Sequence, residues 1–161
     1  MKVCNSEAMK VIKELEEKKK NVIYTEDYRS RVSYKEGEEK ICGKYDYSKT
    51  RAAVEEIDGR IRGIKHALAV CKCTAAVEGF GLTIGEALVY LAQLNAEYQQ
   101  LGKLSGYDKL SRRITANGVL EYTECLYDPE KVVADMEELR AKIGKLQVAI
   151  DRANLTNFIE I

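Results

Sequence analysis

Proline and tryptophan are almost missing from this 161-residue sequence: proline occurs once, at Pro129, and tryptophan does not occur. Because proline is the commonest helix breaker, its scarcity favours long uninterrupted helices. A chain of this length can bury a hydrophobic core without a structural metal or disulfides. We therefore expect a single helical domain over residues 1–161.

Net charge and long apolar runs are also lacking. The 26 lysines and arginines balance 26 aspartates and glutamates, so no overall field attracts duplex nucleic acid or an anionic membrane. No run approaches the roughly 18 apolar residues of a membrane span, and the first residues show no secretion signal. These features predict a cytoplasmic protein that binds neither membranes nor duplex nucleic acid.

Residues for metal binding and acid–base catalysis are few. The one histidine, His66, has no nucleophile or orienting acid specified around it, and we interpret it as a helical surface or partly buried residue. The cysteines are odd in number and scattered, which favours reduced thiols over a disulfide framework. They are Cys4, Cys42, Cys71, Cys73 and Cys125. We expect a protein that is not an enzyme and has no metal and no cofactor.

Four helices are predicted by hydrophobic spacing, over about residues 6–24, 48–74, 83–104 and 129–153. In the second and fourth, apolar residues recur in alternating steps of three and four, as in a coiled-coil seam. The seam residues are Val54, Ile57, Ile61, Ile64, Leu68 and Cys71, then Val132, Met136, Leu139, Ile143, Leu146, Ile150 and Ala153.

The starts of the third and fourth helices have capping signals. Asp128 and Pro129 fit an N-cap acid followed by proline at the first helical position, and Thr83 with Glu86 has the spacing of a capping box. The buried residues expected in the third helix are Ile84, Leu88, Leu91, Leu94, Tyr98 and Leu101. The first helix is expected to bury Ala8, Ile12, Leu15 and Val22.

A small β-hairpin is predicted over about residues 112–126. Asn117 and Gly118 favour a two-residue type I′ turn, and the C-terminal residues 158–161 could add a third strand. A two-stranded hairpin alone is marginally stable in water, so it should lie on a helix or on a partner's strand. The predicted fold is mostly α: an antiparallel long-helix bundle or coiled coil with a hairpin insertion. We expect it to be oligomeric, because the two seams provide more apolar surface than four helices can bury within one chain.

The candidate ligand-binding residues gather around this hairpin. Arginine pairs hold phosphates in fork geometry and tyrosines stack on bases. The sequence therefore predicts that Arg112 and Arg113 hold phosphate and that Tyr107, Tyr122 or Tyr127 stacks on a base. The alternative is a solvated basic turn with tyrosines that cover a helix.

A second anionic group could be met by Thr83 or by the backbone around Gly81, at the start of the third helix, because helix N-termini attract anions. The sequence lacks both the preceding strand and the Gly-Lys-Thr/Ser ending of a phosphate loop. Ordinary loop chemistry is the alternative interpretation.

Three segments resemble a family of short bacterial and phage helical proteins labelled septicolysin-like: residues 57–68 (IDGRIRGIKHAL), 82–88 (LTIGEAL) and 146–156 (LQVAIDRANLT). The resemblance covers most of the chain from Ser48 onward. It implies a helical oligomer with a small hairpin insertion and supplies no catalytic residues. The family is similar in size and setting to phage-borne proteins that oligomerise and trap nucleotide immune signals such as cyclic ADP-ribose derivatives.

We therefore expect a non-enzymatic, homo-oligomeric protein that binds a small phosphorylated, nucleotide-like ligand, a phage-type sponge acting in anti-defence. The first alternative is a structural or protein-interaction module without a small ligand. A phosphodiester hydrolase dependent on His66 is the second alternative.

Overall fold

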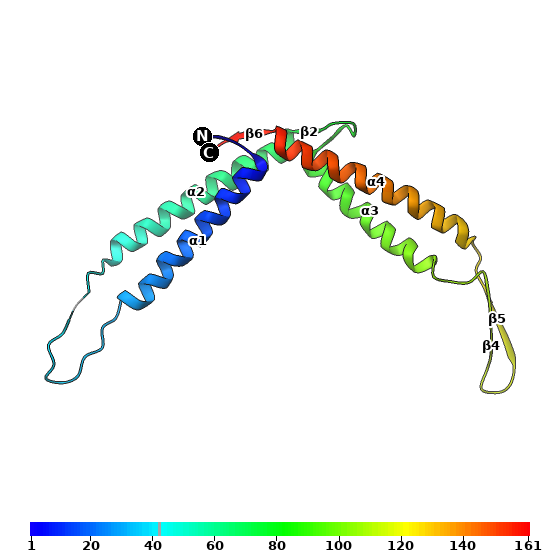
Figure 1. Cartoon of the computed structure of the whole chain (residues 1–161), viewed down its shortest axis with the longest axis horizontal. Helices are drawn as coiled ribbons and strands as arrows, with labels where there is room; N and C mark the ends of the chain where they lie inside the picture. Colours follow the sequence, from blue (N-terminus) through cyan, green and yellow to red (C-terminus); the bar gives the residue numbers. More distant parts are fainter. Residues whose placement is uncertain (42) are drawn as a thin grey trace. The chain divides into compact units, whose positions relative to one another are not determined.

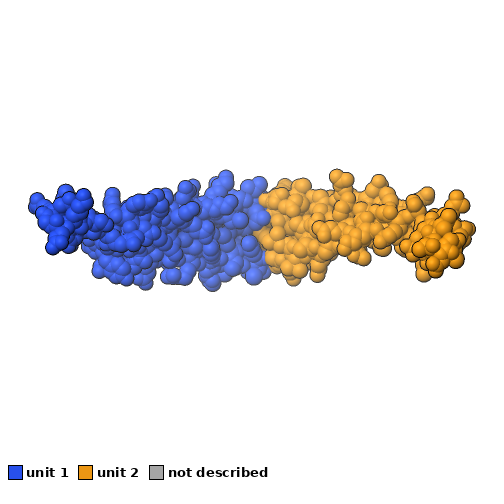
Figure 2. Space-filling view, turned by 90° about the horizontal axis from the view of Figure 1, so that it is seen from below, with its two compact units in different colours: residues 1–74, 154–161 blue, residues 75–153 orange. Residues whose placement is uncertain are grey.

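The computed structural model describes residues 1–41 and 43–161, which form two compact units. Unit 1 contains residues 1–74 and 154–161, and unit 2 contains residues 75–153 (Figure 2). The single domain expected from the sequence stays a prediction. The protein is mostly helical, as predicted, and the strands form three separate antiparallel pairs.

Unit 1 is built on two antiparallel helices, α1 (Asn5–Arg29) and α2 (Tyr47–Thr74), which lie side by side (Figure 1). The apolar positions predicted in α2 face the core: Ile57, Ile61, Ile64, Leu68 and Cys71 are buried, and Val54 is half-buried. On α1, which packs against α2, Ala8, Ile12 and Leu15 are buried as well. Three ion pairs join the helices: Lys19 with Asp58 at 2.7 Å, Lys65 with Glu16 at 3.1 Å, and Arg51 with Glu26.

A short sheet closes the end of unit 1 where the chain begins. β1 (Lys2–Cys4) pairs antiparallel with β6 (Phe158–Glu160), with Val3 opposite Ile159, and both of these side chains are buried. The C-terminal strand was predicted to extend the hairpin of residues 112–126, and that was wrong. The strand pairs with the N-terminal strand instead. Because successive side chains of a strand point to opposite faces, Ile159 lies on the core face of β6.

Unit 2 contains α3 (Ile84–Leu104) and α4 (Pro129–Thr156, whose last three residues belong to unit 1). Seven of their buried residues form one apolar cluster with Val77: Ile84, Ala87, Leu94, Leu139, Leu146, Ile150 and Ala153. The α4 seam is confirmed. In α3, Leu88 was expected to be buried, but its side chain is exposed. The positions of α3 that face the core are Ala87, which is buried, and Leu91, which is half-buried.

Two hairpins complete unit 2. β2 (Ala76–Val77) pairs with β3 (Leu82–Thr83) just before α3, and β4 (Leu110–Ile114) pairs with β5 (Leu120–Glu124) between α3 and α4. The β4–β5 hairpin was predicted, but its turn is not type I′. Gly118 has a positive φ of 72° and Asn117 does not. The Gly118 N–H donates to the Thr115 carbonyl at 2.9 Å, which fits a three-residue loop with one left-handed residue.

Candidate ligand-binding site

The β4–β5 hairpin separates the two arginines that the sequence places next to each other. Arg112 lies opposite Tyr122, and Arg113 lies opposite Glu121. Because successive strand residues point to opposite faces, the two guanidinium groups lie on different faces of the hairpin. Arg113 is also engaged, since its Nε donates to Glu121 Oε2 at 2.5 Å. The hairpin therefore brings Arg112 together with Tyr122 and does not form a paired arginine fork.

The other two tyrosines lie at the base of the hairpin. The Tyr127 hydroxyl donates to the Leu104 carbonyl at 2.8 Å and ties the segment before α4 to the end of α3. Burial raises the pKa of Tyr127, and its hydrogen bond with Cys125 and the nearby charges of Cys125 and Tyr107 raise it further. Tyr107 is exposed. Tyr127 thus has a structural contact that competes with base stacking.

Thr83 and Gly81 lie at the other end of α3 from the hairpin. An α-helix rises about 1.5 Å per residue, so the 21 residues of α3 separate them by roughly 30 Å. The predicted capping box is confirmed: Thr83 N–H and hydroxyl donate to the Glu86 carboxylate, each at 2.8 Å. These bonds lower the pKa of Glu86. Thr83 and Arg112 cannot hold one small ligand within a single unit.

The remaining sequence candidates are exposed or isolated. His66 is exposed on α2, and Cys4, Cys71, Cys73 and Cys125 are free thiols, while Cys42 lies outside the described residues. Among residues 1–41 and 43–161, no group of three histidine, cysteine or acidic side chains could hold a metal ion. None of the described helices is long and apolar enough to cross a bilayer.

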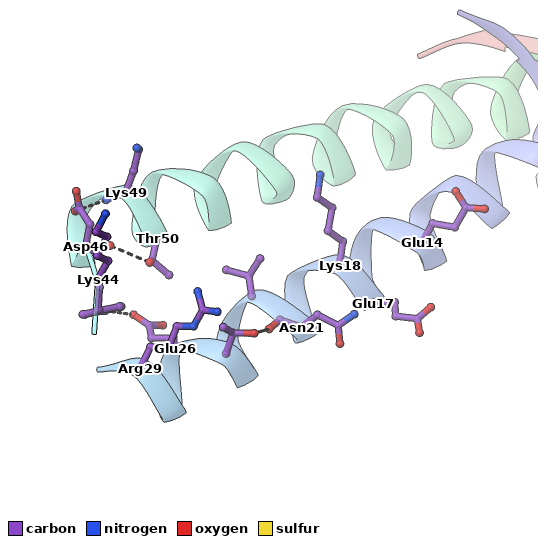
Figure 3. A pocket seen from close by; sticks show the side chains of 13 residues that line it. Glu14, Glu17, Lys18, Asn21, Glu26, Arg29, Lys44, Asp46, Lys49 and Thr50 are labelled. Carbon is purple, nitrogen blue, oxygen red and sulfur yellow. Dashed lines mark hydrogen bonds between the residues drawn. The ribbon is translucent and has the colours of Figure 1, made fainter. Parts of the chain in front are cut away.

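Unit 1 contains a groove that the sequence did not predict. Its volume is about 630 Å³, and it lies between the C-terminal half of α1, the segment before α2 and the first turn of α2 (Figure 3). The residues that line it are Glu14, Glu17, Lys18, Asn21, Val22, Thr25, Glu26, Arg29, Lys44, Tyr45, Asp46, Lys49 and Thr50. We call it the α1–α2 groove.

Glu26 holds the wall of the α1–α2 groove in place. Its side chain is only 16% exposed, it forms an ion pair with Arg51, and it accepts a hydrogen bond from the Tyr45 hydroxyl at 2.6 Å. Arg51 also lies over the Tyr47 ring, 5.7 Å from its centre. One carboxylate on α1 therefore fixes both the segment before α2 and the first turn of α2.

The first turn of α2 is capped by Asp46. Its Oδ1 accepts from the Lys49 N–H at 3.0 Å, and its carbonyl accepts from the Thr50 hydroxyl at 2.9 Å. The helix begins at the groove, so the positive end of its dipole faces this region. The Asp46 carboxylate is thus occupied by capping α2, and the Glu26 carboxylate is occupied by its contacts with Arg51 and Tyr45.

The groove is lined by equal numbers of acidic and basic side chains, but more of the acidic ones are already engaged in contacts. Two of the four acids, Glu26 and Asp46, are engaged in the contacts above, and Glu17 points away from α2 (Figure 3). Among the residues that the structure describes, Lys18, Arg29 and Lys44 form no ion pair. Lys18 reaches from α1 toward α2 (Figure 3). Cationic side chains are therefore available to an anionic ligand.

Sequence reasoning missed this groove because its walls are distant in the sequence. Glu26 and Arg51 are separated by 25 residues, and nothing in the spacing of either helix indicates their contact. The segment between the first two predicted helices was given no structure, and it supplies Lys44, Tyr45 and Asp46. The one local signal was Asp46, an acid placed directly before a helix, as N-caps are.

Comparison with known proteins identifies a fold and no function. No family model and no curated protein matches the chain. A solved structure is similar along the whole length: a functionally unknown conserved protein from Corynebacterium diphtheriae, with a TM-score of 0.60 and 14% sequence identity. The match covers 99% of this chain and 100% of that chain, so the two proteins share the same helical architecture. The resemblance to septicolysin-like proteins stays a prediction.

Proposed function

We propose that the protein binds a small phosphorylated ligand in the α1–α2 groove and releases it unchanged. The observation that carries this proposal is a groove of about 630 Å³ whose lining includes Lys18, Arg29 and Lys44, cations that pair with no carboxylate of residues 1–41 and 43–161. Ligand sites in proteins typically measure about 300 to 1,000 Å³. A nucleotide-sized molecule fits this range.

The charge distribution favours phosphate as the group that is held. Lys18 and Lys44 can each place an ammonium group on a phosphate oxygen, and the Arg29 guanidinium can offer two parallel N–H donors. Asn21 supplies an amide that can donate to and accept from a base or sugar.

The ligand class that we propose includes nucleotide signals of the cyclic ADP-ribose type, and the cellular role would then be sequestration. A sequestering protein requires slow dissociation and intact ligand rather than turnover. We propose the α1–α2 groove as the ligand site in place of the hairpin that the sequence predicted.

Thermal shift with a defined panel tests this function. Pyrophosphate, AMP, ADP and cyclic ADP-ribose isomers are added separately, and ligand recovered after denaturation is analysed by mass spectrometry. At a ligand concentration 100 times Kd, stability rises by about 2.7 kcal/mol, which is readily measured as a higher Tm. We expect at least one phosphorylated compound to raise Tm and to be recovered intact.

The matched variants are Lys18→Met, which removes a groove cation, and Lys20→Met, which removes an exposed cation outside the groove lining. Lys18→Met should weaken the Tm shift and Lys20→Met should leave it unchanged. An unchanged Tm with every compound in the panel, or equal effects of the two variants, would reject the proposal. Recovery of a converted ligand would identify an enzyme instead.

A further inference from the structure

The β4–β5 hairpin has one apolar face and one polar face. Register and alternation place Leu110, Arg112, Ile114, Leu120, Tyr122 and Glu124 on the same side, which we call the Tyr122 face. The opposite side carries Ser111, Thr123 and the ion pair of Arg113 with Glu121. Such alternation is typical of a sheet that is packed on one side and solvated on the other.

The Tyr122 face is nevertheless open. All ten residues of the two strands are exposed, and the apolar ones remain accessible at 59% for Leu110, 74% for Ile114, 47% for Leu120 and 59% for Tyr122. In the part of the chain that the structure describes, no element covers them. A two-stranded hairpin needs a packed face to be stable in water. The exposed Tyr122 face is therefore available to a partner.

Charge on the Tyr122 face favours an identical face as its partner. The face carries one cation, Arg112, and one anion, Glu124, so it is neutral and has no preference for an anionic surface. When two such faces stack about a twofold axis parallel to the strands, β4 of each copy covers β5 of the other. Arg112 then lies over the partner's Tyr122 and diagonal to the partner's Glu124. Isologous contacts of this kind are self-complementary.

We propose that the Tyr122 face docks against the same face of a second copy of this chain. This inference goes beyond ligand binding in the α1–α2 groove, which lies in the other unit and does not depend on it. It also places Arg112 and Tyr122 at a subunit contact rather than on a nucleotide.

Sedimentation equilibrium of the purified full chain, from low micromolar to submillimolar concentration, tests the proposal. The expected result is a mass that rises toward at least twice the 18.2 kDa of one chain. Tyr122→Asp should raise the self-association Kd about tenfold or more, because it buries an unpaired charge. Thr123→Asp, on the polar face of the same strand, is the matched control and should leave Kd unchanged.

Charge exchange tests the pairing itself. Arg112→Glu and Glu124→Arg should each weaken association about tenfold, and the double variant should recover most of the wild-type affinity. Helical circular dichroism should be the same in all variants, because the strands contribute no helix. A wild-type chain that stays at 18.2 kDa, or a double variant weaker than both single variants, overturns the proposal. So does Tyr122-dependent binding to phosphatidylglycerol vesicles without any change in mass.

Discussion

Replacing Glu26 with glutamine should loosen the wall of the α1–α2 groove by an amount that the contacts allow to be estimated. The change removes the negative charge that pairs with Arg51 and weakens the bond from the Tyr45 hydroxyl, while the side-chain shape is kept. A hydrogen bond to a charged group contributes about 1.5 to 3 kcal/mol. The Arg51 side chain is 42% exposed, so solvent reduces its ion pair to at most about 1 kcal/mol.

We expect Glu26→Gln to destabilise unit 1 by about 1 to 2 kcal/mol, because the new amide can still accept from Tyr45. Hydrogen exchange followed by mass spectrometry measures this locally: amides of residues 18–29 and 43–50 should exchange faster, and those of α4 should not change. Glu17→Gln, an exposed acid that points away from α2 (Figure 3), is the control and should have no effect.

A double-mutant cycle with Tyr45→Phe isolates the pair. If the contact between Glu26 and Tyr45 holds the segment before α2, the two single changes should not add, and the coupling energy should be about 0.5 to 1.5 kcal/mol. Strictly additive effects, or faster exchange spread evenly over both units, would refute the role given to Glu26.

Three further outcomes are expected. Leu146→Ala, at a fully buried position, should cost about 2 to 5 kcal/mol of stability in urea unfolding. The pKa of Glu86 is lowered in the folded state, so its contribution to stability is present above the ordinary pKa of 4.5 and is lost as pH falls through the lower folded value; Glu86→Gln should flatten this loss in urea titrations at several pH values. Gly118→Ala places a side chain at a φ of 72° and should cost the hairpin about 1 kcal/mol, seen as faster amide exchange in β4 and β5 only.

The helices were predictable because their packing follows local spacing. The α4 seam alternates steps of three and four over its whole length, and every seam residue except half-buried Met136 and Ile143 is buried. In α3, two apolar residues compete for one core position, and Leu88 was chosen where the structure buries the smaller Ala87. Periodicity allowed either one, and only the packing against α4 decides between them.

Pairings between distant residues were not predictable in the same way. The C-terminal strand has an apolar residue at Ile159, but nothing local indicates that Val3 is its partner. Adjacent arginines suggested a phosphate fork, and the strand geometry places Arg112 and Arg113 on opposite faces. The α1–α2 groove depends on Glu26 meeting Tyr45 and Arg51 after the chain has turned back.

The location of bound phosphate is the most direct test of the proposed function. Amide resonances of the full chain are recorded during titration with pyrophosphate and with cyclic ADP-ribose, and perturbed residues are mapped on the sequence. Our account predicts that the changes concentrate at residues 18–29 and 44–50. Changes concentrated at residues 110–124, or none at saturating concentrations of either compound, would contradict it.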